Sequence, residues 1–246
     1  MSKRVLLELD NVGVSFRQGR SLFNRAAVEV LHDISFPLFS GESLGIVGRN
    51  GVGKSTLLKL MAGIIAPDQG VVRNHGANCT LLNLQIGFKL DLTGADNIYL
   101  MGILYGLTRT TINERFDSIL NFSELGDAIY KPVKTYSTGM RARLGFSVAL
   151  QMNTAILLVD EIMGVGDIEF REKSSAAMQE MLRSEQTVVL VSHQAQTIKN
   201  LCDRAIWIEE GSIRLMGTPD EVIAAYEKYV LEKRSKRKLN SILCSS

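Results

Sequence analysis

Hydrophobic and polar residues follow one another in blocks along this chain, and the blocks predict strands and helices in mixed order. Near the N-terminus, apolar residues at strand spacing predict two short strands, at residues 5–9 and 12–16. The polar, arginine-bearing residues 17–25 then predict a hairpin or loop. A strand at residues 43–47, a glycine-rich turn and a helix at about residues 54–61 follow. This order is that of a strand, a loop of the phosphate-binding type and a helix.

Helical periodicity dominates the middle of the chain. After predicted strands near Val71 and Thr80, apolar residues recur at helical spacing, as at Ile98 and Met101 and again at Ile112. We therefore predict a helical insertion over about residues 88–152.

The second half returns to alternating strands and helices. We expect strands at residues 155–159, 187–191, 205–208 and 212–215, and helices at residues 169–182 and 194–202. The two central strands are uninterrupted apolar runs, which are typical of parallel strands buried on both faces. The pattern predicts an α/β protein with a sheet core.

A last helix is predicted from Thr218, where an N-cap residue precedes Pro219 and a capping-box Glu221. We expect the main domain to cover residues 1–231 and a basic tail to cover residues 232–246. Five cations lie between Lys233 and Lys238. Two interpretations stay open for them: a solvated, frayed terminus, or contact with anionic lipid headgroups.

Composition narrows the class of protein. The chain has 246 residues, a net charge of +2, 46% apolar residues and 22% charged residues, which is the mix of an ordinary globular protein and excludes disorder and overall polycation behaviour. Its longest clean apolar run, at residues 155–159, is far short of the roughly 20 residues that span a bilayer. The apolar stretch at the N-terminus breaks at Glu8, too early for a signal peptide, so we expect residence in the cytosol.

Cys79, Cys202 and Cys244 are far apart and odd in number, and we interpret them as ordinary thiols.

The strongest local motif is GRNGVGKST, which matches G-x-x-x-x-G-K-[ST] between the predicted strand and helix. Its glycines allow backbone N–H groups to turn toward phosphate oxygens, and the following helix directs its positive end at the same anion. Lys54 would reach the β- and γ-phosphates, and the Ser55 hydroxyl would bind Mg²⁺. The residues expected to bind nucleotide here are Gly48, Arg49, Asn50, Gly51, Val52, Gly53, Lys54, Ser55 and Thr56.

Polar residues end two of the predicted apolar strands. Asp160 would orient the Mg²⁺ shell, and the adjacent Glu161 would polarise an attacking water. Ser192 and His193 follow the next strand and reach the same sheet edge, where a histidine can contact the γ-phosphate or the water.

A third motif, YSTGM, opens a helix about twenty residues before the strand that carries Asp160. Ser137 and Gly139 there offer a hydroxyl and an unobstructed N–H to an anion. Taken alone, this motif also fits an ordinary N-cap.

Together and in this order, the P-loop, YSTGM, LLVDE and VSH resemble the nucleotide-binding subunit of ATP-binding cassette (ABC) transporters over about residues 5–231. YSTGM departs from the usual LSGGQ signature but keeps its serine and second glycine. The stretches YSTGMRARLGF, DEIMGVGD, VSHQ and LCDRAIWIEEG look like the subfamily that exports bacterial surface polysaccharides of the capsule or O-antigen type. This resemblance implies a P-loop core of the RecA-like type, an antiparallel β subdomain and a helical subdomain.

The resemblance also implies roles for single residues. Ser137 and Gly139 become signature contacts to the γ-phosphate of a nucleotide held by a second protomer. Asp167 becomes the D-loop residue that crosses the dimer interface, Glu161 the catalytic base and His193 the switch histidine.

Two further positions follow from the same resemblance. Phe16 falls where the family stacks an aromatic ring on adenine, with a core strand aromatic as the alternative. Gln85 falls where a Q-loop glutamine contacts Mg²⁺ and the membrane partner.

The implied cofactors are ATP and Mg²⁺, and the implied partners are a second copy of the chain and a separate transmembrane permease at the cytoplasmic face of the inner membrane. Polysaccharide would be contacted only indirectly, and nucleic acid not at all. The chain ends soon after the cassette, so we expect the capsule-type arrangement without an added carbohydrate-recognising domain. Two alternatives stay open: a cassette for another cargo such as teichoic acid, lipid or drug, and a soluble cassette ATPase acting on ribosomes or nucleic acid.

Overall fold

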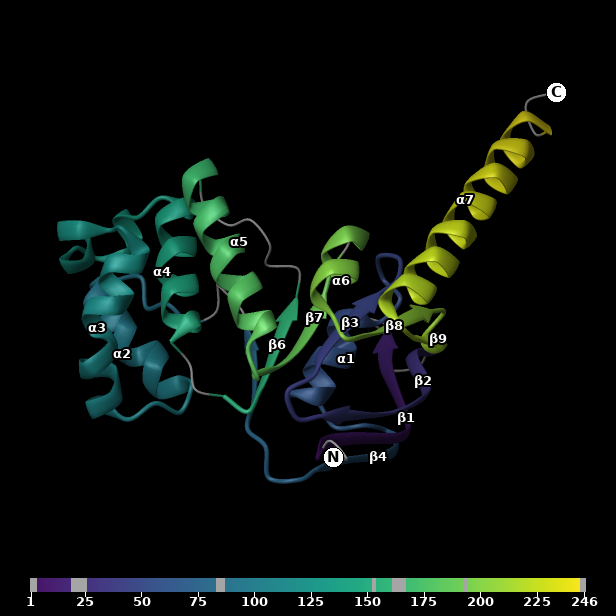
Figure 1. Cartoon of the computed structure of the whole chain (residues 1–246), viewed down its shortest axis with the longest axis horizontal. Helices are drawn as coiled ribbons and strands as arrows, with labels where there is room; N and C mark the ends of the chain where they lie inside the picture. Colours follow the sequence, from purple (N-terminus) through teal and green to yellow (C-terminus); the bar gives the residue numbers. More distant parts are fainter. Residues whose placement is uncertain are drawn as a thin grey trace.

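The computed structural model describes residues 4–18, 26–82, 87–151, 154–160, 167–192 and 194–243. Two sheets and a separate group of helices make up the fold (Figure 1). The strands are β1 (Val5–Gln18), β2 (Ala26–Phe39), β3 (Ser43–Val47), β4 (Gln69–Asn74), β5 (Cys79–Leu82), β6 (Ile156–Asp160), β7 (Thr187–Val191), β8 (Arg204–Glu209) and β9 (Ser212–Gly217). The α-helices are α1 (Lys54–Met61), α2 (Gly94–Leu104), α3 (Arg109–Ser123), α4 (Thr138–Leu150), α5 (Ile168–Arg183), α6 (Ala195–Leu201) and α7 (Pro219–Leu243). Within these residues, no helix is both long enough and apolar enough to cross a membrane.

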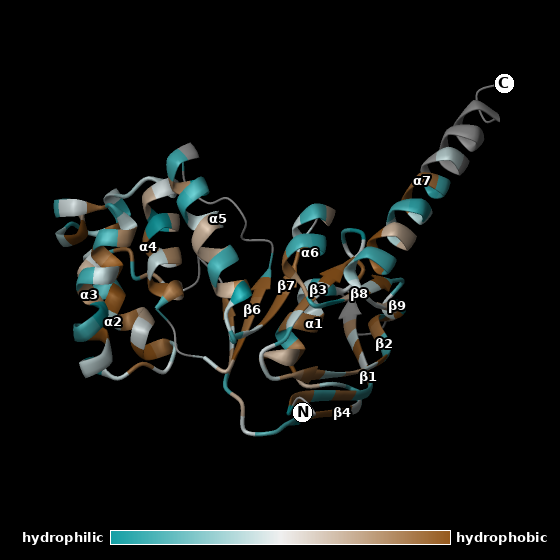
Figure 2. Ribbon diagram, viewed as in Figure 1, coloured by the Kyte–Doolittle hydropathy of each residue, from teal (hydrophilic) through white to brown (hydrophobic). Residues whose placement is uncertain are grey.

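The larger sheet has the order β5-β6-β7-β3-β8-β9, and its strands are parallel except for β9. All five residues of β3 and of β7 are buried, as expected of strands covered on both faces. Figure 2 shows these central strands as the most hydrophobic part of the chain, while the helices around them are mixed. The predicted α/β class is confirmed, and β3, β7 and α1 have the predicted bounds.

The smaller sheet is antiparallel, in the order β2-β1-β4, and two predictions about it were wrong. The two predicted N-terminal strands are one strand, β1, which also contains two residues of the predicted loop, while residues 19–25 lie outside the described residues. β2 was not predicted. The physical reason is a series of register shifts between β1 and β2, with Asn11 and Asp33 at φ of 50° and 51°, which interrupt the alternation of buried and exposed residues.

The helices α2, α3 and α4 form a cluster at one end of the molecule, apart from both sheets (Figure 1). They share a core of their own, which includes Ile98, Met101, Ile112, Ile119, Leu144 and Val148. The helices expected in the middle of the chain are therefore present, between residues 94 and 150.

The last helix, α7, begins as predicted and ends later than predicted. Thr218 and Glu221 form a capping box, in which the Thr218 N–H and hydroxyl donate to Glu221 Oε2 at 3.1 and 2.8 Å. The helix then continues past Leu231 to Leu243, so the frayed terminus predicted there is wrong. Lysine, arginine, glutamate and leucine are good helix formers, so a charge run does not by itself end a helix. In Figure 1 the C-terminal half of α7 points away from the rest of the molecule.

Candidate nucleotide site

The P-loop connects β3 to α1, and two of its glycines are required by close backbone contacts. Gly53 has a φ of +105°, and a Cβ atom there would lie 2.6 Å from Leu31 Cδ2 and 2.9 Å from the carbonyl oxygen of Val30. A Cβ at Gly48 would lie 2.4 Å from the carbonyl oxygen of Ile208. The loop is therefore enclosed between β2 and β8 and has no room for side chains at these positions.

Lys54 is the first residue of α1 and is only 7% exposed. Its Nζ donates hydrogen bonds to the carbonyl oxygens of Gly48 and Arg49, at 2.8 and 2.9 Å. The ammonium group is thus held inside the curve of the loop, where a phosphate of an incoming nucleotide would meet it.

A cavity of about 350 Å³ opens beside this loop. It is lined by Val30, Asn50, Gly51, Gly53, Lys54, Ser55, Thr56, Asp160 and Val191. Asp160 ends β6 and pairs with Val191 of β7, so the sheet brings this carboxylate next to the start of α1. The structure therefore brings together Lys54, Ser55 and Asp160, as the sequence predicted.

The donors in this cavity fit Mg²⁺ bound together with phosphates. A hydroxyl from Ser55 and a carboxylate from Asp160 are oxygen ligands, which Mg²⁺ prefers, and it usually takes its other ligands from phosphates and water. Over the part of the chain that the structure describes, no cluster could hold a metal ion with three or more histidine, cysteine, aspartate or glutamate ligands.

The signature and D-loop candidates lie elsewhere. Ser137 is the N-cap of α4, and its exposed Oγ accepts a hydrogen bond from the Met140 N–H at 3.1 Å, while Gly139 follows in the first turn. Asp167 is the N-cap of α5, where its Oδ1 accepts from the Phe170 N–H at 3.1 Å. None of these three predicted residues lines the cavity, so one chain does not bring them to its own P-loop.

The electrostatics of Asp167 come mainly from one neighbour. A hydrogen bond from Arg143, followed by the bond from the Phe170 N–H, lowers the pKa of the Asp167 carboxyl below its ordinary value. The carboxylate is therefore charged at neutral pH.

The other predicted residues divide into two groups. Glu161, His193 and Gln85 lie outside the described residues. Phe16 is 45% exposed and pairs with Val28 across β1 and β2, so the alternative of a core aromatic does not hold for it. Its contact with adenine stays a prediction.

Sequence reasoning missed Val30 as a wall of the cavity, because it missed the strand β2 that carries this residue. The signal that would have found the strand is the alternation of Ile34, Phe36 and Leu38, all of which are buried.

A phosphate-binding loop between a buried parallel strand and a helix, with a carboxylate at the end of a second strand nearby, defines a P-loop nucleotide-binding protein. The sequence profile of the ABC transporter family matches residues 31–164. The chain belongs to the ABC transporter family, which confirms the resemblance found in its motifs.

Relatives of known name share much of the sequence. The chain is 42% identical to the O-antigen export system ATP-binding protein RfbB of Klebsiella pneumoniae, over 80% of each chain. It is 44% identical to the protein of the same name from Myxococcus xanthus, over 87% of this chain and 48% of that one. It is also 42% identical to the teichoic acids export ATP-binding protein TagH of Listeria monocytogenes, over 81% of this chain and 59% of the relative. The chain thus spans only about half of the Myxococcus relative.

Solved structures confirm the fold. The ATP-binding cassette MJ0796, in a dimeric post-hydrolysis state bound to ADP and Pi, matches with a TM-score of 0.71 and 21% identity, over 87% of this chain and 99% of that one. The cbiO1 protein of Clostridium perfringens, part of an ABC transporter complex, matches with a TM-score of 0.66 and 22% identity, over 95% of both chains.

Proposed function

We propose that this chain is the ATP-hydrolysing subunit of an ABC transporter that energises the export of a bacterial cell-surface polysaccharide. One observation carries the ATPase part: Lys54, Ser55 and Asp160 line one cavity, while Ser137 caps a helix outside it. Such a chain contains one half of a catalytic site and, on another surface, the complementary half for a second copy.

In this proposal the P-loop N–H groups and the Lys54 ammonium bind the phosphates of ATP, and Ser55 and Asp160 hold Mg²⁺. When bound, Mg²⁺ supplies positive charge that offsets the charge of the β- and γ-phosphates. Glu161 takes a proton from the attacking water, whose oxygen bonds to the γ-phosphorus as the bond to the β,γ-bridging oxygen breaks and ADP leaves. His193 contacts the γ-phosphate, Gln85 contacts Mg²⁺, and Phe16 stacks on adenine.

Two copies complete each other's sites. Ser137 and Gly139 of one copy contact the γ-phosphate held by the other, and Asp167 crosses the interface between them. The dimeric cassette MJ0796 supports this arrangement by its shared fold. Loss of the γ-phosphate removes the bridging contacts and reopens the pair, which is the motion that drives transport.

The division of the chain follows from this role. Residues 1–231 would form the nucleotide-binding domain, with residues 88–152 as a helical subdomain that passes the motion to a separate membrane permease. Residues 232–246 would form a basic C-terminal segment. The protein would be peripheral, at the cytoplasmic face of the inner membrane.

The names of the relatives favour polysaccharide as the cargo. The O-antigen relative from Klebsiella pneumoniae aligns over 80% of its own length, whereas the teichoic acid relative aligns over 59% of its length. Teichoic acid is itself a cell-surface polymer and stays the second candidate. Two experiments decide between these cargoes. The first purifies the chain from membranes together with its permease. The second identifies the glycan that accumulates in the cytosol when the gene is deleted.

The ATPase mechanism is tested by the Glu161→Gln substitution. We expect turnover to fall by a factor of about 100 or more, because removing the residue that accepts the proton of water costs on the order of this factor. The same variant should form a stable dimer in ATP on gel filtration, since the contacts to the nucleotide persist. A variant that stays monomeric and hydrolyses ATP at the normal rate contradicts the proposal.

The Lys54→Ala substitution is the control for the cavity. It removes the buried cation of the P-loop, so ATP binding or hydrolysis should be lost, and ATP should cause no dimerisation. Unchanged ATPase activity would show that this cavity is not the nucleotide site. Sedimentation of the chain with ribosomes instead of membranes would overturn the transport role.

A further inference from the structure

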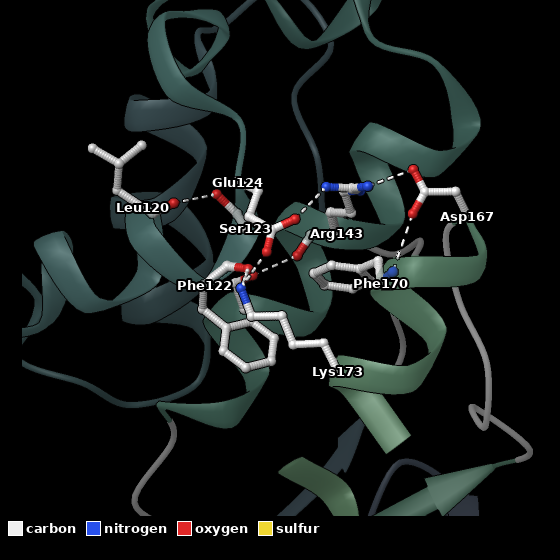
Figure 3. A network of polar contacts seen from close by, with 9 residues as sticks. Leu120, Phe122, Ser123, Glu124, Arg143, Asp167, Phe170 and Lys173 are labelled. Atoms are coloured by element: carbon white, nitrogen blue, oxygen red, sulfur yellow. Dashed lines mark hydrogen bonds and ion pairs between the residues drawn. The ribbon is translucent and has the colours of Figure 1, made fainter. Parts of the chain in front are cut away.

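Four charged side chains connect helices α3, α4 and α5, and we call them the Arg143 network: Glu124, Arg143, Asp167 and Lys173 (Figure 3). Arg143 Nη1 donates to Glu124 Oε2 at 2.9 Å, and Arg143 Nη2 donates to Asp167 Oδ2. Lys173 Nζ donates to the second oxygen of Glu124, Oε1, at 2.6 Å. Two cations thus face two carboxylates, and both terminal nitrogens of Arg143 have a carboxylate partner.

Aromatic rings pack against both cations of the network. The Arg143 side chain is 14% exposed, and its guanidinium lies 5.0 Å from the centre of the buried Phe170 ring. Lys173 Nζ lies 4.7 Å from the centre of the Phe122 ring and also donates to the Phe122 carbonyl oxygen at 3.0 Å. Phe146 of α4 packs against both rings, with centroid distances of 6.1 and 6.2 Å. A planar guanidinium fixed by two carboxylates and a ring has little freedom to change its position.

The end of α3 is part of the same arrangement. Glu124 follows the last residue of α3 and has a φ of +55°, in the left-handed region where a glycine is the usual residue. Glutamate at this position supplies both acceptors for Arg143 and Lys173, which a glycine could not.

The position of Arg143 along the chain connects two parts of the proposed mechanism. Ser137, at the exposed start of α4, precedes Arg143 by less than two helical turns, so the two are on one rigid helix. On its other side, Arg143 binds Asp167, which follows Asp160 of the cavity by a short stretch of chain. Along the chain, the network is therefore connected through Asp167 to the strand that ends in the cavity, and through α4 to Ser137, which is proposed to complete the site of the other copy.

The geometry points to Arg143 as a positioning residue for ATP hydrolysis: it sets the place of Asp167 relative to Ser137, so that both meet a second copy together. Glu124 and Lys173 in turn hold Arg143 against α3 and α5. Each nucleotide site is thereby connected to the other through the network. This inference rests on the proposed function, because it concerns the two-copy ATPase cycle.

The test compares Arg143→Met with Arg73→Met. Arg73 of β4 is a matched control, because it also lies between two carboxylates, at 3.0 Å from Asp10 and 3.5 Å from Glu8, but in the antiparallel sheet. For Arg143→Met we expect kcat to fall about tenfold and the Hill coefficient for ATP to fall from about 2 toward 1, as when two sites lose their coupling. Binding of ADP, which reports the cavity of one chain, should change less than about twofold. Arg73→Met should leave all three quantities as in the natural chain.

Two results with Arg143→Met overturn the inference. One is a normal kcat and Hill coefficient in Arg143→Met, and the other is loss of ADP binding in parallel with kcat, which indicates a general structural defect. If Arg143→Met does not fold, Lys173→Met decides: it keeps the contact of Arg143 with Asp167 but loosens Glu124, and it should still lower the Hill coefficient. An unchanged Hill coefficient there also overturns the role. If the natural chain shows no ATPase activity, or if its activity is unchanged in Lys54→Ala, the proposed function fails instead. That failure is distinct from a failure of the Arg143 inference.

Discussion

At the scale of single residues, three of the proposed site side chains make hydrogen bonds to backbone groups. Lys54 donates to two carbonyl oxygens of its own loop, and Ser137 and Asp167 each accept from the backbone N–H three residues on. Backbone partners keep their place when nearby side chains differ. This explains how a motif such as YSTGM can depart from its family pattern and still keep the geometry of its serine.

Acid titration tests Glu124 as a member of the Arg143 network. Hydrogen bonds and charge from Lys173, and then from Arg143, lower the pKa of Glu124 below its ordinary value of 4.5. A lowered pKa in the folded state means that the stabilisation is complete above the unfolded-state pKa and is lost as pH falls through the folded-state pKa. We therefore expect Glu124→Gln to be less stable than the natural chain in urea at pH 7, and the difference to shrink below about pH 4.5. Asp167, whose pKa is lowered too, is present in both proteins, so most of its effect cancels.

The exposed Glu114 of α3 provides the control, since Glu114→Gln on the same helix should change stability little at either pH. A difference for Glu124→Gln that persists unchanged at pH 3 would show that packing, and not the charge, is responsible.

At the scale of elements, the strands most predictable from the sequence were those in which every residue is buried. β3 and β7 are buried at every residue, so an unbroken apolar run predicts them with their observed bounds. β2 could not be found in this way, because register shifts and the left-handed Asp33 divide its buried residues into Leu31 on one side and Ile34 onward on the other. A bulge is defined by the pairing of two strands, so it cannot be recognised from the hydrophobic pattern of one strand alone.

The same distinction applies to the site. Lys54, Ser55 and Asp160 come from local motifs next to fully buried strands, and all three line one cavity. Arg143 was missed as a functional candidate, because its partners Glu124 and Asp167 lie 19 and 24 residues away along the chain. Such contacts depend on how α3, α4 and α5 pack together.

The close packing of α6 against β3 can be tested by substitution. A Cβ atom at Gly45 would lie 2.6 and 2.9 Å from Cγ2 and Cδ1 of Ile198, and 3.1 Å from Cys202 Sγ. We expect Gly45→Ala to lower the free energy of unfolding by about 1–3 kcal/mol, as overpacking of a core does. Because Ile198→Ala removes both clashing atoms, the double variant should be less destabilised than the sum of the single ones, by about 0.5 kcal/mol or more. Urea unfolding of the four proteins measures this, and strict additivity would show that the helix already moves aside.

At the scale of the whole molecule, the fold separates the P-loop cavity from the start of α4. The P-loop cavity lies beside the sheets, and the cluster of α2, α3 and α4, in which Ser137 caps α4, lies at the other end (Figure 1). Because Ser137 does not line the cavity of its own chain, a closed site in the proposed mechanism requires a second copy. ATP then acts as a ligand of the dimer more than of the single chain.

Thermal unfolding in nucleotide therefore tests the whole mechanism. A ligand at 100 times its Kd adds about 2.7 kcal/mol to the stability of the folded state. For a chain of this size, about 1 kcal/mol corresponds to roughly 2–4 °C in Tm, so ADP or ATP with Mg²⁺ should raise Tm by about 5–11 °C. Lys54→Ala should show no such shift in Tm.

In Glu161→Gln, the rise in Tm caused by ATP should also increase with protein concentration, because dimer formation follows mass action. The rise caused by ADP should not depend on protein concentration. A shift by ATP in this variant that is the same at low and high protein concentration would mean that a single chain binds ATP to completion, which contradicts the two-copy site.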